Sequence, residues 1–407
     1  MCDDEQCCTQ IGKKKTNSRF TLLDLPVEIF FHICSFLDAS TLVHGLSLVC
    51  KQFHEILNDN SMWKVRINHI WPNTDYPVLP PDEDDELFWK LSCVALERQS
   101  SIWKDVESMD RMSLGSVQYS TIDGLLLMEG GQICISGARD RSLMLWKLPT
   151  EENNQESIQS IDFAHDGWIW DLTAIDNTVY SCSWDQTVKA WTLTNTELAL
   201  FKTYEMIVSG ALLCVASCPE LPLFATGSFC RTVLVFDTRL GCNPIVKFQP
   251  HKRAVIRLSM SSNFILSASE DRTVAIWDQR AGRLMKNVTI SQESFPMSMC
   301  MRRDMVYVGD CSAKLHVLDP KKGFELVKCY STGHKKGISG VHVGPGYLIT
   351  SSTDETVRIS SPTDPPQHIV TLQTRFGEVA SIDYSNDVLA ISGTDGIEVY
   401  RARMRCT

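Results

Sequence analysis

Residues 181–191 read SCSWDQTVKAW, and this pattern of a short strand, a turn with an Asp and a second strand ending in Trp recurs along the chain. Close copies are SGARDRSLMLW, which ends at Trp146, and SASEDRTVAIW, which ends at Trp277. Weaker copies end at Phe236, Leu318, Ser360 and Tyr400. Successive copies end 40 to 45 residues apart. A period near 40 residues with this strand–turn–strand content predicts an all-β, seven-bladed β-propeller, an architecture usually used for binding.

The last repeat predicts how the ring closes. Each blade needs four strands, but the seventh unit ends at Tyr400 and only seven residues follow it. The segment around Leu114–Ser120 is the available candidate for the missing outer strand. Pairing it with the last blade would remove the exposed sheet edges that invite aggregation. We therefore place the propeller at residues 113–407.

Composition restricts the function classes. The chain of 407 residues has a net charge of −10 and a pI near 5.5. Non-specific binding to nucleic acid or to an acidic membrane depends on a basic surface, so neither partner is expected. The N-terminus lacks the basic-then-apolar order of a signal peptide, and no uninterrupted apolar run of 18 residues is present. We expect an intracellular protein, cytoplasmic or nuclear or both.

The 16 cysteines do not resemble a disulfide framework. Several fall within strand patterns, where a thiol serves as a small apolar residue, and no pair has CxxC spacing. Cys2, Cys7 and Cys8 form the one cluster, without a nearby His. We therefore expect a reducing compartment, no metal, no cofactor and no small-molecule substrate.

The N-terminal part predicts a small helical unit. Residues 1–19 are polar and predict a disordered tail. In residues 20–68, apolar residues recur at helical spacing, with Pro26 suited to a first helical turn and Asp38 to a helix N-cap. A unit of this size has a thin core and usually needs a partner to cover its apolar faces. Residues 69–112 predict a linker, rich in Pro and acid over 72–86 and helical after that.

Three repeated sets of polar residues permit two interpretations. His165, His251 and His334 each lie 20 residues before an Asp, and a Ser lies two residues before each Asp. The sets are completed by Ser183, Asp185, Trp191, Ser269, Asp271, Trp277, Ser352 and Asp354, with Ser360 in place of a third Trp. A hydrolase would need such a triad once, with an oxyanion site, whereas a structural brace should recur in each blade. Repetition therefore favours buried hydrogen-bonded braces, complete in blades two and four and weaker in blades three and five.

Two resemblances follow from these motifs. The repeats resemble WD40 repeats, and LLDLPVEIFFHICSFLDASTLVHGLSLVCKQFHEIL with the later MWK resembles an F-box. The order of an F-box, a linker and seven WD40 units resembles the F-box/WD40-repeat family over nearly the whole chain outside the tail. The implied fold is a small all-α F-box domain joined by a partly helical linker to an all-β seven-bladed WD40 propeller.

The resemblance implies a non-catalytic substrate receptor of an SCF-type ubiquitin ligase. In this family the F-box binds the Skp1 adaptor, which connects it to a cullin and a RING subunit. The implied adaptor-facing residues, some of which we expect in the helical core instead, are Leu25, Pro26, Ile29, Ile33, Leu37, Leu42, Val49, Phe53 and Trp63. A scaffold that binds Skp1 and a partner without directing ubiquitin transfer uses the same two surfaces and remains the alternative.

The resemblance also indicates where a protein substrate would bind. In WD40 blades, the positions three and five after the loop His and the one before the turn Asp surround the central channel. In blade two these are Trp168, Trp170 and Trp184, and Arg139 occupies one of them in blade one. Exposed aromatic clusters are common binding hot spots. With one clear Arg at these positions, we predict an aromatic-anchored rather than a phosphate-dense peptide motif.

Overall fold

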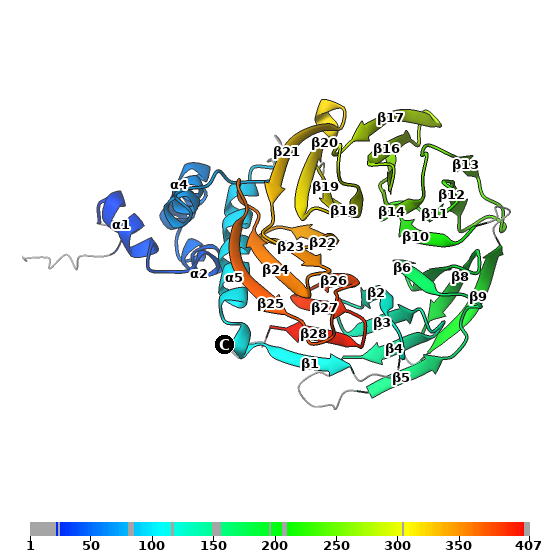
Figure 1. The fold of residues 1–407 in the computed structure, drawn as a ribbon. Coiled ribbons are helices and arrows are strands. Elements are labelled where there is room, and N and C mark those ends of the chain that lie inside the picture. The colour runs from blue at the N-terminus through cyan, green and yellow to red at the C-terminus, as the bar shows by residue number, and fades with distance from the viewer. Residues whose placement is uncertain are drawn as a thin grey trace, which may run out of the picture.

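The computed structural model describes residues 22, 25–79, 85–114, 118–148, 156–194, 197–205, 210–302 and 305–402. The predicted disordered tail and the Cys2, Cys7 and Cys8 cluster lie outside these residues. The described chain forms an N-terminal helical domain and a seven-bladed propeller (Figure 1). The predicted fold class is therefore confirmed.

The helical domain packs around a small aromatic core. Its helices are α1 (Val27–Cys34), α2 (Ala39–His44), η2 (Leu46–Leu48), α3 (Lys51–Leu57) and α4 (Asn60–Ile70). Phe30 on α1 stacks on Phe53 of α3 with ring centroids 4.7 Å apart, and Trp63 of α4 is fully buried. Asp38 caps α2 by accepting the backbone N–H of Thr41 at 2.8 Å.

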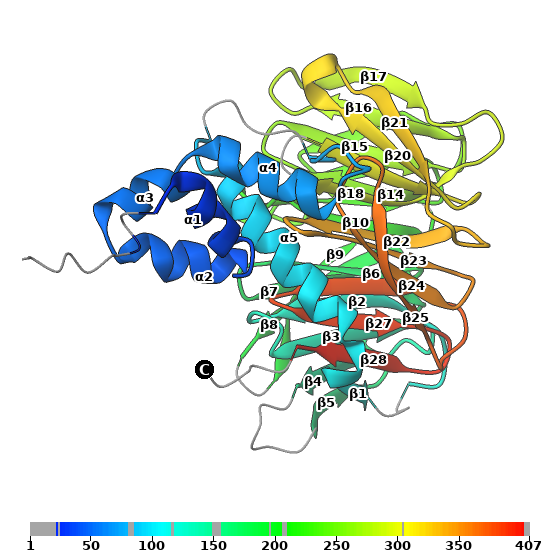
Figure 2. The ribbon, with the colours of Figure 1, turned by 90° about the vertical axis from the view of Figure 1, so that its left-hand side faces the viewer.

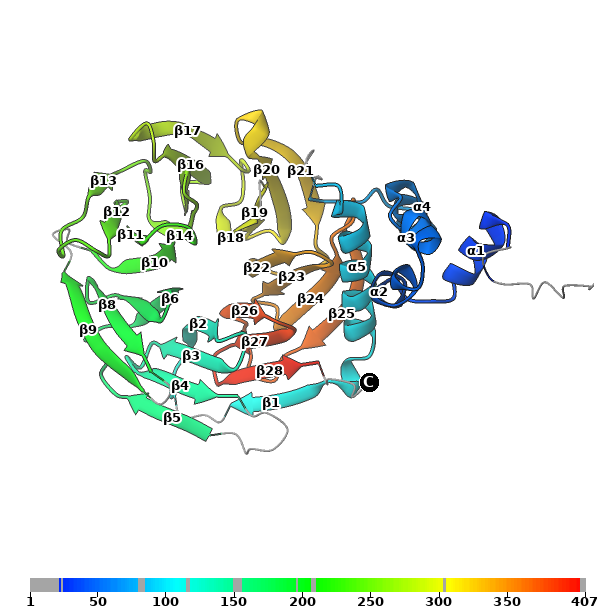
Figure 3. The same ribbon diagram turned by 180° about the vertical axis from the view of Figure 1, so that it is seen from behind.

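Helix α5 (Phe88–Lys104) covers this core and continues onto the propeller, followed by η3 (Val106–Ser108). Its Cys93 and Leu96 are buried in the core of the helical domain, and Trp103 is buried in the core of blades six and seven. Figures 1 and 3 show α5 along these blades, with the other helices projecting beyond it. The chain itself therefore covers one side of the thin helical core, and other apolar side chains of the domain remain exposed.

The propeller consists of seven four-stranded antiparallel sheets. Blade one contains β2 (Ile122–Met128), β3 (Ile133–Ala138), β4 (Leu143–Lys147) and β5 (Glu156–Ile161). Blade two contains β6 (Ile169–Ile175), β7 (Thr178–Ser183), β8 (Thr187–Leu193) and β9 (Leu198–Glu205). Blade three contains β10 (Leu212–Ser217), β11 (Leu223–Ser228), β12 (Val233–Asp237) and β13 (Val246–Phe248). Blade four contains β14 (Val255–Met260), β15 (Phe264–Ser269), β16 (Thr273–Asp278) and β17 (Arg283–Thr289). Blade five contains β18 (Pro296–Arg302), β19 (Met305–Asp310), β20 (Lys314–Asp319) and β21 (Glu325–Ser331), with the short helix η4 (Pro320–Lys322) between its last two strands. Blade six contains β22 (Ile338–Gly344), β23 (Tyr347–Ser352), β24 (Thr356–Ser361) and β25 (Gln367–Gln373).

Blade seven closes the ring with a strand from before the first repeat. β26 (Ser381–Ser385), β27 (Val388–Ser392) and β28 (Ile397–Arg401) are joined by β1 (Asp110–Leu114), which pairs with β28 from Asp110 opposite Arg401 to Leu114 opposite Ile397. The closing strand therefore begins four residues earlier than the predicted segment Leu114–Ser120. The prediction that a strand from before the first repeat completes the last blade is confirmed, and only its position is shifted, because pairing with β28 determines the register.

The segment before α5 also packs on the propeller. The backbones of Asp75 and Asp364 form an antiparallel bridge, and Val78 N–H donates to the oxygen of Pro362 at 3.0 Å. Val78 and Leu79 are buried against blades five and six. The first part of the predicted linker is therefore a second attachment of the helical domain to the ring, and these apolar residues explain the attachment.

The ring has two faces of different character. In each blade, the turns between the first and second strands and between the third and fourth strands lie on one face, which we call the lower face. The turns between the second and third strands lie on the opposite face, which we call the upper face. Both attachments contact the lower face, through the turns at Gly346, Asp387 and Pro362. The helical domain thus extends from the lower side of the ring, as Figure 2 shows from the side.

Gly346 permits the closest approach of α5 to the propeller. It has φ of +86°, and a Cβ there would overlap the backbone oxygen of Ala95. Gly323 has a similar φ of +65°, but a Cβ there would meet no atom within 4 Å. We expect Gly323→Ala to cost about 1 kcal/mol from backbone strain, and Gly346→Ala about 1–3 kcal/mol more from overlap. Thermal unfolding midpoints of the two variants would check this, and equal losses would contradict the contact.

Candidate protein-interaction surfaces

A chain of hydrogen bonds braces blade two. The indole N–H of Trp191 donates to Ser181 Oγ at 2.9 Å, and Ser181 Oγ lies 2.7 Å from His165 Nε2. On the other side of the imidazole, Nδ1 lies 2.8 Å from Asp185 Oδ2. With the imidazole proton on Nδ1, the donors run in one direction from Trp191 to Asp185 and each buried group is paired.

The serine of this brace differs from the predicted one. Ser181, four residues before the Asp, joins the chain in place of Ser183. Both side chains lie on the same face of β7 because strand side chains alternate with a period of two, so spacing alone did not distinguish them. Ser183 Oγ instead accepts the backbone N–H of Asp185 at 3.1 Å.

In blades four and six, too, the hydroxyl residue four positions before the Asp bonds to the His, in place of the predicted Ser two positions before it. His251 Nε2 lies 2.9 Å from Ser267 Oγ, and His334 Nε2 lies 2.9 Å from Thr350 Oγ1. Their Nδ1 atoms face the turn carboxylates, at 3.2 Å from Asp271 and 3.4 Å from Asp354. The predicted Ser269 and Ser352 have another role, since each accepts the N–H of its turn Asp and donates to a backbone oxygen of the loop before the first strand.

The prediction that Trp277 completes the brace of blade four was wrong. Trp277 stacks on Phe248 of blade three with ring centroids 4.1 Å apart, and it is half-buried rather than enclosed. In the part of the chain that the structure describes, its indole N–H makes no hydrogen bond. The ring of Phe248 stabilises this alternative position.

Two further braces use residues that sequence reasoning did not single out. In blade one, Gln118 takes the place of His: its Oε1 accepts from Ser136 Oγ at 2.8 Å and its Nε2 donates to Ser142 Oγ at 3.0 Å. In blade five, the buried Asp310 lies 2.9 Å from His316 Nε2. Blade five is therefore braced through Asp310, although Ser312 stands at the position where the turn Asp is expected.

These braces have the electrostatics of structural groups. Burial lowers the pKa of His165, His251 and His334, despite the carboxylate beside each. Hydrogen bonds from His165 and Thr187 hold the pKa of Asp185 well below its usual range, although burial acts in the opposite direction. His165 is fully buried. Neutral, enclosed histidines of this kind stabilise the turns, since no substrate could reach them.

Three indoles gather on the upper face of blade two. The ring centroids of Trp168 and Trp184 are 4.5 Å apart, and those of Trp170 and Trp184 are 5.6 Å apart. Trp168 is 39% exposed and Trp184 41%, whereas Trp170 is half-buried. We call these three residues the indole cluster.

Local backbone geometry explains the convergence of the indoles. The N–H of Trp184 donates to the oxygen of Trp168 at 2.9 Å, which ties the turn to the preceding loop. Trp170 is the extra residue where the register shifts between Ile169 and Asp171, and such bulges re-aim a side chain. Blade two therefore directs all three indoles to one place.

Arg139 lies against the indole cluster but is already paired. Its guanidinium carbon lies 4.9 Å from the ring centroid of Trp170 and 5.5 Å from that of Trp168. It also forms two hydrogen bonds with Asp123, of 2.7 and 3.1 Å. This bonding raises the pKa of Arg139. Its charge is neutralised locally, so the surface here is aromatic with little net charge.

Blade three extends the aromatic surface with a residue that sequence reasoning missed. The N–H of Phe229 donates to the oxygen of Ala211 at 2.8 Å, the same bond that links Trp184 to Trp168. Phe229 is 62% exposed. Cys230 stands at the position of the turn Asp in this repeat, so Phe229 occupies the position equivalent to Trp184. That equivalence was the signal in the sequence that could have identified Phe229.

The helical domain divides its predicted residues between core and surface. Leu42, Phe53 and Trp63 are buried in its core, and Leu37 is half-buried against it. The predicted residues that remain accessible or partly accessible are Leu25, Pro26, Ile29, Ile33 and Val49. Burial of Leu42, Phe53 and Trp63 excludes them from a docking surface, because α1 to α4 enclose them.

Sequence reasoning missed the two most exposed apolar residues of this domain, Phe36 and Leu48. Phe36 is 77% exposed and Leu48 is 74% exposed, and Val49 next to it is 68% exposed. Phe36 falls seven residues after Ile29 in the same stripe, which was the available signal. We call Ile29, Ile33, Phe36, Leu48 and Val49 the helical apolar surface.

Comparison with known proteins agrees with this architecture. Residues 22–67 match the model of the F-box-like family, and residues 155–192, 242–278 and 325–359 match that of the WD domain, G-beta repeat. F-box/WD repeat-containing protein 9 of Homo sapiens is 33% identical over 389 residues, covering 93% of this chain and 82% of the relative. The chain belongs to the F-box/WD repeat-containing protein family.

Two further relatives have the same domain order in their names. F-box/WD repeat-containing protein 9 of Bos taurus is 32% identical over 388 residues, covering 93% of this chain and 82% of the relative. F-box/WD repeat-containing protein mec-15 of Caenorhabditis elegans is 28% identical over 398 residues, covering 93% of this chain and 96% of the relative. The F-box and WD repeat assignments are thus confirmed.

Two kinds of feature are absent from the described residues. None of the described helices has the length and apolarity needed to span a membrane. Among the same residues, no group of three or more His, Cys, Asp or Glu side chains is arranged to hold a metal ion.

The contrast between Trp191 and Trp277 can be measured with one substitution. Trp191→Phe removes a buried N–H donor and leaves a cavity, so we expect a loss of about 2–3 kcal/mol. Trp277→Phe removes no hydrogen bond and should cost less than about 1 kcal/mol. The test is the thermal unfolding midpoint of each variant. Equal decreases in the unfolding midpoint would contradict the structural difference between the two tryptophans.

Proposed function

We propose that this F-box/WD repeat protein is the substrate-recognition subunit of an SCF-type ubiquitin ligase. The helical apolar surface binds the Skp1 adaptor, and through it a cullin and a RING subunit. The indole cluster binds a protein substrate. The observation that carries the proposal is the presence of two separate exposed apolar surfaces, one on the F-box and one on the opposite face of the propeller, on a continuous packed framework.

The helical apolar surface suits a protein partner. Its side chains remain accessible although α5 already covers another side of the same domain. Several large apolar side chains left exposed on one small domain indicate an interaction site. The F-box family match makes a Skp1-type adaptor the partner that best fits this surface.

The attachment of the two domains suits catalysis by proximity. A ligase receptor contributes by holding a substrate lysine near a ubiquitin thioester that other subunits supply, so no residue here needs to react. This function benefits from a fixed distance between the two binding surfaces. Helix α5 and the Asp75–Leu79 segment provide that fixed distance, since each is packed on the ring.

The upper face at blade two suits an aromatic-anchored peptide better than a densely phosphorylated one. The indole cluster and Phe229 provide large apolar contact areas, which are typical of binding hot spots. Recognition of several phosphates requires several unpaired Arg or Lys side chains. Arg139, the basic residue of the predicted substrate site, is already bound to Asp123.

The first test removes adaptor binding without unfolding the domain. We expect Leu48→Asp combined with Val49→Asp to abolish co-purification of Skp1 and cullin, because both side chains are exposed and charges there would oppose apolar docking. Leu91→Asp on α5, where Leu91 is 50% exposed, is the control. Skp1 binding without cullin in the unmodified protein would favour the scaffold alternative, and unchanged binding by the double variant would contradict the proposed surface.

The second test concerns the substrate surface. We expect the Trp168→Ala, Trp170→Ala, Trp184→Ala triple variant to lose captured client proteins in cells with a blocked proteasome, by roughly tenfold or more, while Skp1 binding persists. The control is Phe201→Ala, which removes an aromatic residue that is 69% exposed on the outer strand β9. Quantitative mass spectrometry of captured proteins measures the effect. Retention of every client would contradict substrate binding by the indole cluster.

A further inference from the structure

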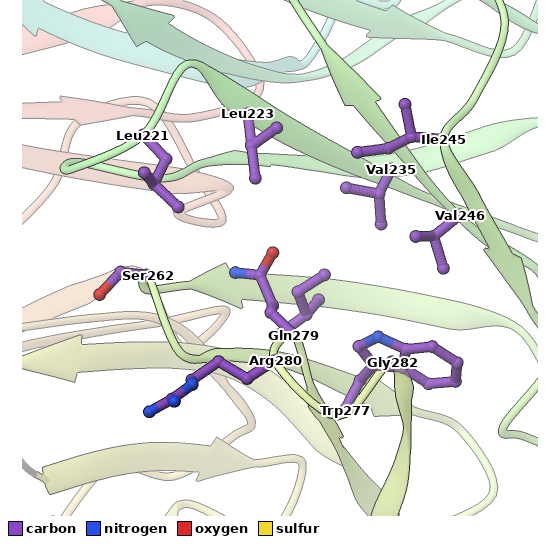
Figure 4. A pocket seen from close by; sticks show the side chains of 11 residues that line it. Leu221, Leu223, Val235, Ile245, Val246, Ser262, Trp277, Gln279, Arg280 and Gly282 are labelled. Carbon is purple, nitrogen blue, oxygen red and sulfur yellow. The ribbon is translucent and has the colours of Figure 1, made fainter.

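An apolar groove lies between blades three and four, apart from both surfaces described above. It has a volume of about 280 Å³. Its apolar lining includes Leu221, Leu223, Ile245, Val246 and Trp277, as Figure 4 shows. The lining comes from the lower-face turns of the two blades and from the strands beside them. The groove is therefore on the face opposite the indole cluster, across the ring from α5 (Figure 1).

The displaced position of Trp277 forms one wall of the groove. In blade two the equivalent Trp191 is enclosed in its brace, but Trp277 leans on Phe248 and borders the groove. Its indole N–H has no hydrogen-bond partner among the described residues. The repeat motif thus supplies an indole with both an apolar face and a free donor at this site.

Hydrogen bonds of two lining residues, Gln279 and Ser262, fix the walls of the groove. Gln279 N–H donates to the oxygen of Asn263, and its Nε2 donates to the oxygen of Ser261. Glu220 accepts the N–H of Ser262 at 3.1 Å, which ties the turns of the two blades together. A groove with fixed walls can bind without a large ordering cost.

One charge identifies the chemistry of the occupant. Arg280 is the charged residue of the lining, and no carboxylate lines the groove among the described residues. Arg280 is exposed and has no ion pair within the described chain, although the protein as a whole is acidic, with a net charge of −10. The nearest acidic residue in sequence, Asp278, accepts the N–H of Ala281 at 2.9 Å, and Glu220, which lies on the turn of the other blade, accepts the N–H of Ser262.

We propose that this groove binds a peptide segment of a partner protein that inserts an aliphatic side chain and places a carboxylate against Arg280. The volume accommodates one or two side chains, not a whole small-molecule ligand of the usual size. The aliphatic anchor contacts Ile245, Val246 and the ring of Trp277. The indole N–H of Trp277 donates to the peptide backbone. The site is a third interaction surface of the protein and the second on its propeller, and it functions whether or not the indole cluster binds a substrate.

Fluorescence anisotropy on the purified full-length chain tests this proposal. The probes are fluorescein-labelled ten-residue peptides with one Leu and one Glu separated by one to four residues on a Gly/Ser background. Matched peptides carry Lys in place of Glu, or Ser in place of Leu. We expect at least one Leu/Glu peptide to bind and both replacements to weaken binding by tenfold or more. Failure of every Leu/Glu peptide to bind would overturn the proposal.

Variants then locate the binding. Ile245 is 45% exposed, so Ile245→Glu fills the groove with a charge without disturbing the core, and it should abolish binding with an unchanged unfolding midpoint. Arg280→Glu should weaken the Leu/Glu peptide tenfold and strengthen its Leu/Lys counterpart, as expected of a direct charge pair. Trp184→Ala, on the upper face, should leave binding unchanged. Three outcomes would overturn the assignment. They are binding that persists in Ile245→Glu, a preference for Glu over Lys in the peptide that persists in Arg280→Glu, and loss of binding in Trp184→Ala.

Discussion

The structure depends on one helix that belongs to two cores. The N-terminal half of α5 completes the F-box core, where Glu97 accepts hydrogen bonds from Arg66 Nε at 2.5 Å and from Ala39 N–H at 2.7 Å. Two residues later, Gln99 donates to Asp387 at 2.8 Å and accepts from Tyr384 and Trp103. A continuous helix without an internal Pro does not kink sharply between two anchors only two residues apart. The position of the F-box relative to the ring is therefore a consequence of ordinary helix geometry.

The braces show how a repeated sequence produces different surfaces. The same spacing of residues encloses Trp191 in blade two and leaves Trp277 against a groove in blade four. The difference comes from the neighbouring blade, where Phe248 offers a ring on which Trp277 stacks. Repeats of a propeller contact mainly their neighbours, so each blade provides a nearly constant frame whose rims vary. This is why both surfaces that we propose for recognition on the propeller lie at its rims.

The exposed apolar residues are separated in a way that suits an adaptor. The helical apolar surface, the indole cluster and the groove lie on different parts of the molecule, so three partners would not compete for contact area. None of these surfaces requires a reactive group, and the buried histidines of the braces are held neutral by burial. This arrangement is consistent with the proposed role of holding other proteins in fixed relative positions.

Local patterns in the sequence were enough to predict the seven blades, the F-box and the approximate place of the indole cluster, because period, turn chemistry and helical spacing are properties of short stretches of chain. They did not distinguish Ser181 from Ser183, since a period of two places both on one face. They also could not show that Leu42, Phe53 and Trp63 are core while Phe36 and Leu48 are surface. Those assignments, the closing strand at Asp110–Leu114, the displaced Trp277 and the double role of α5 follow from tertiary packing. Each depends on which distant segment packs against a residue, and no local pattern contains that information.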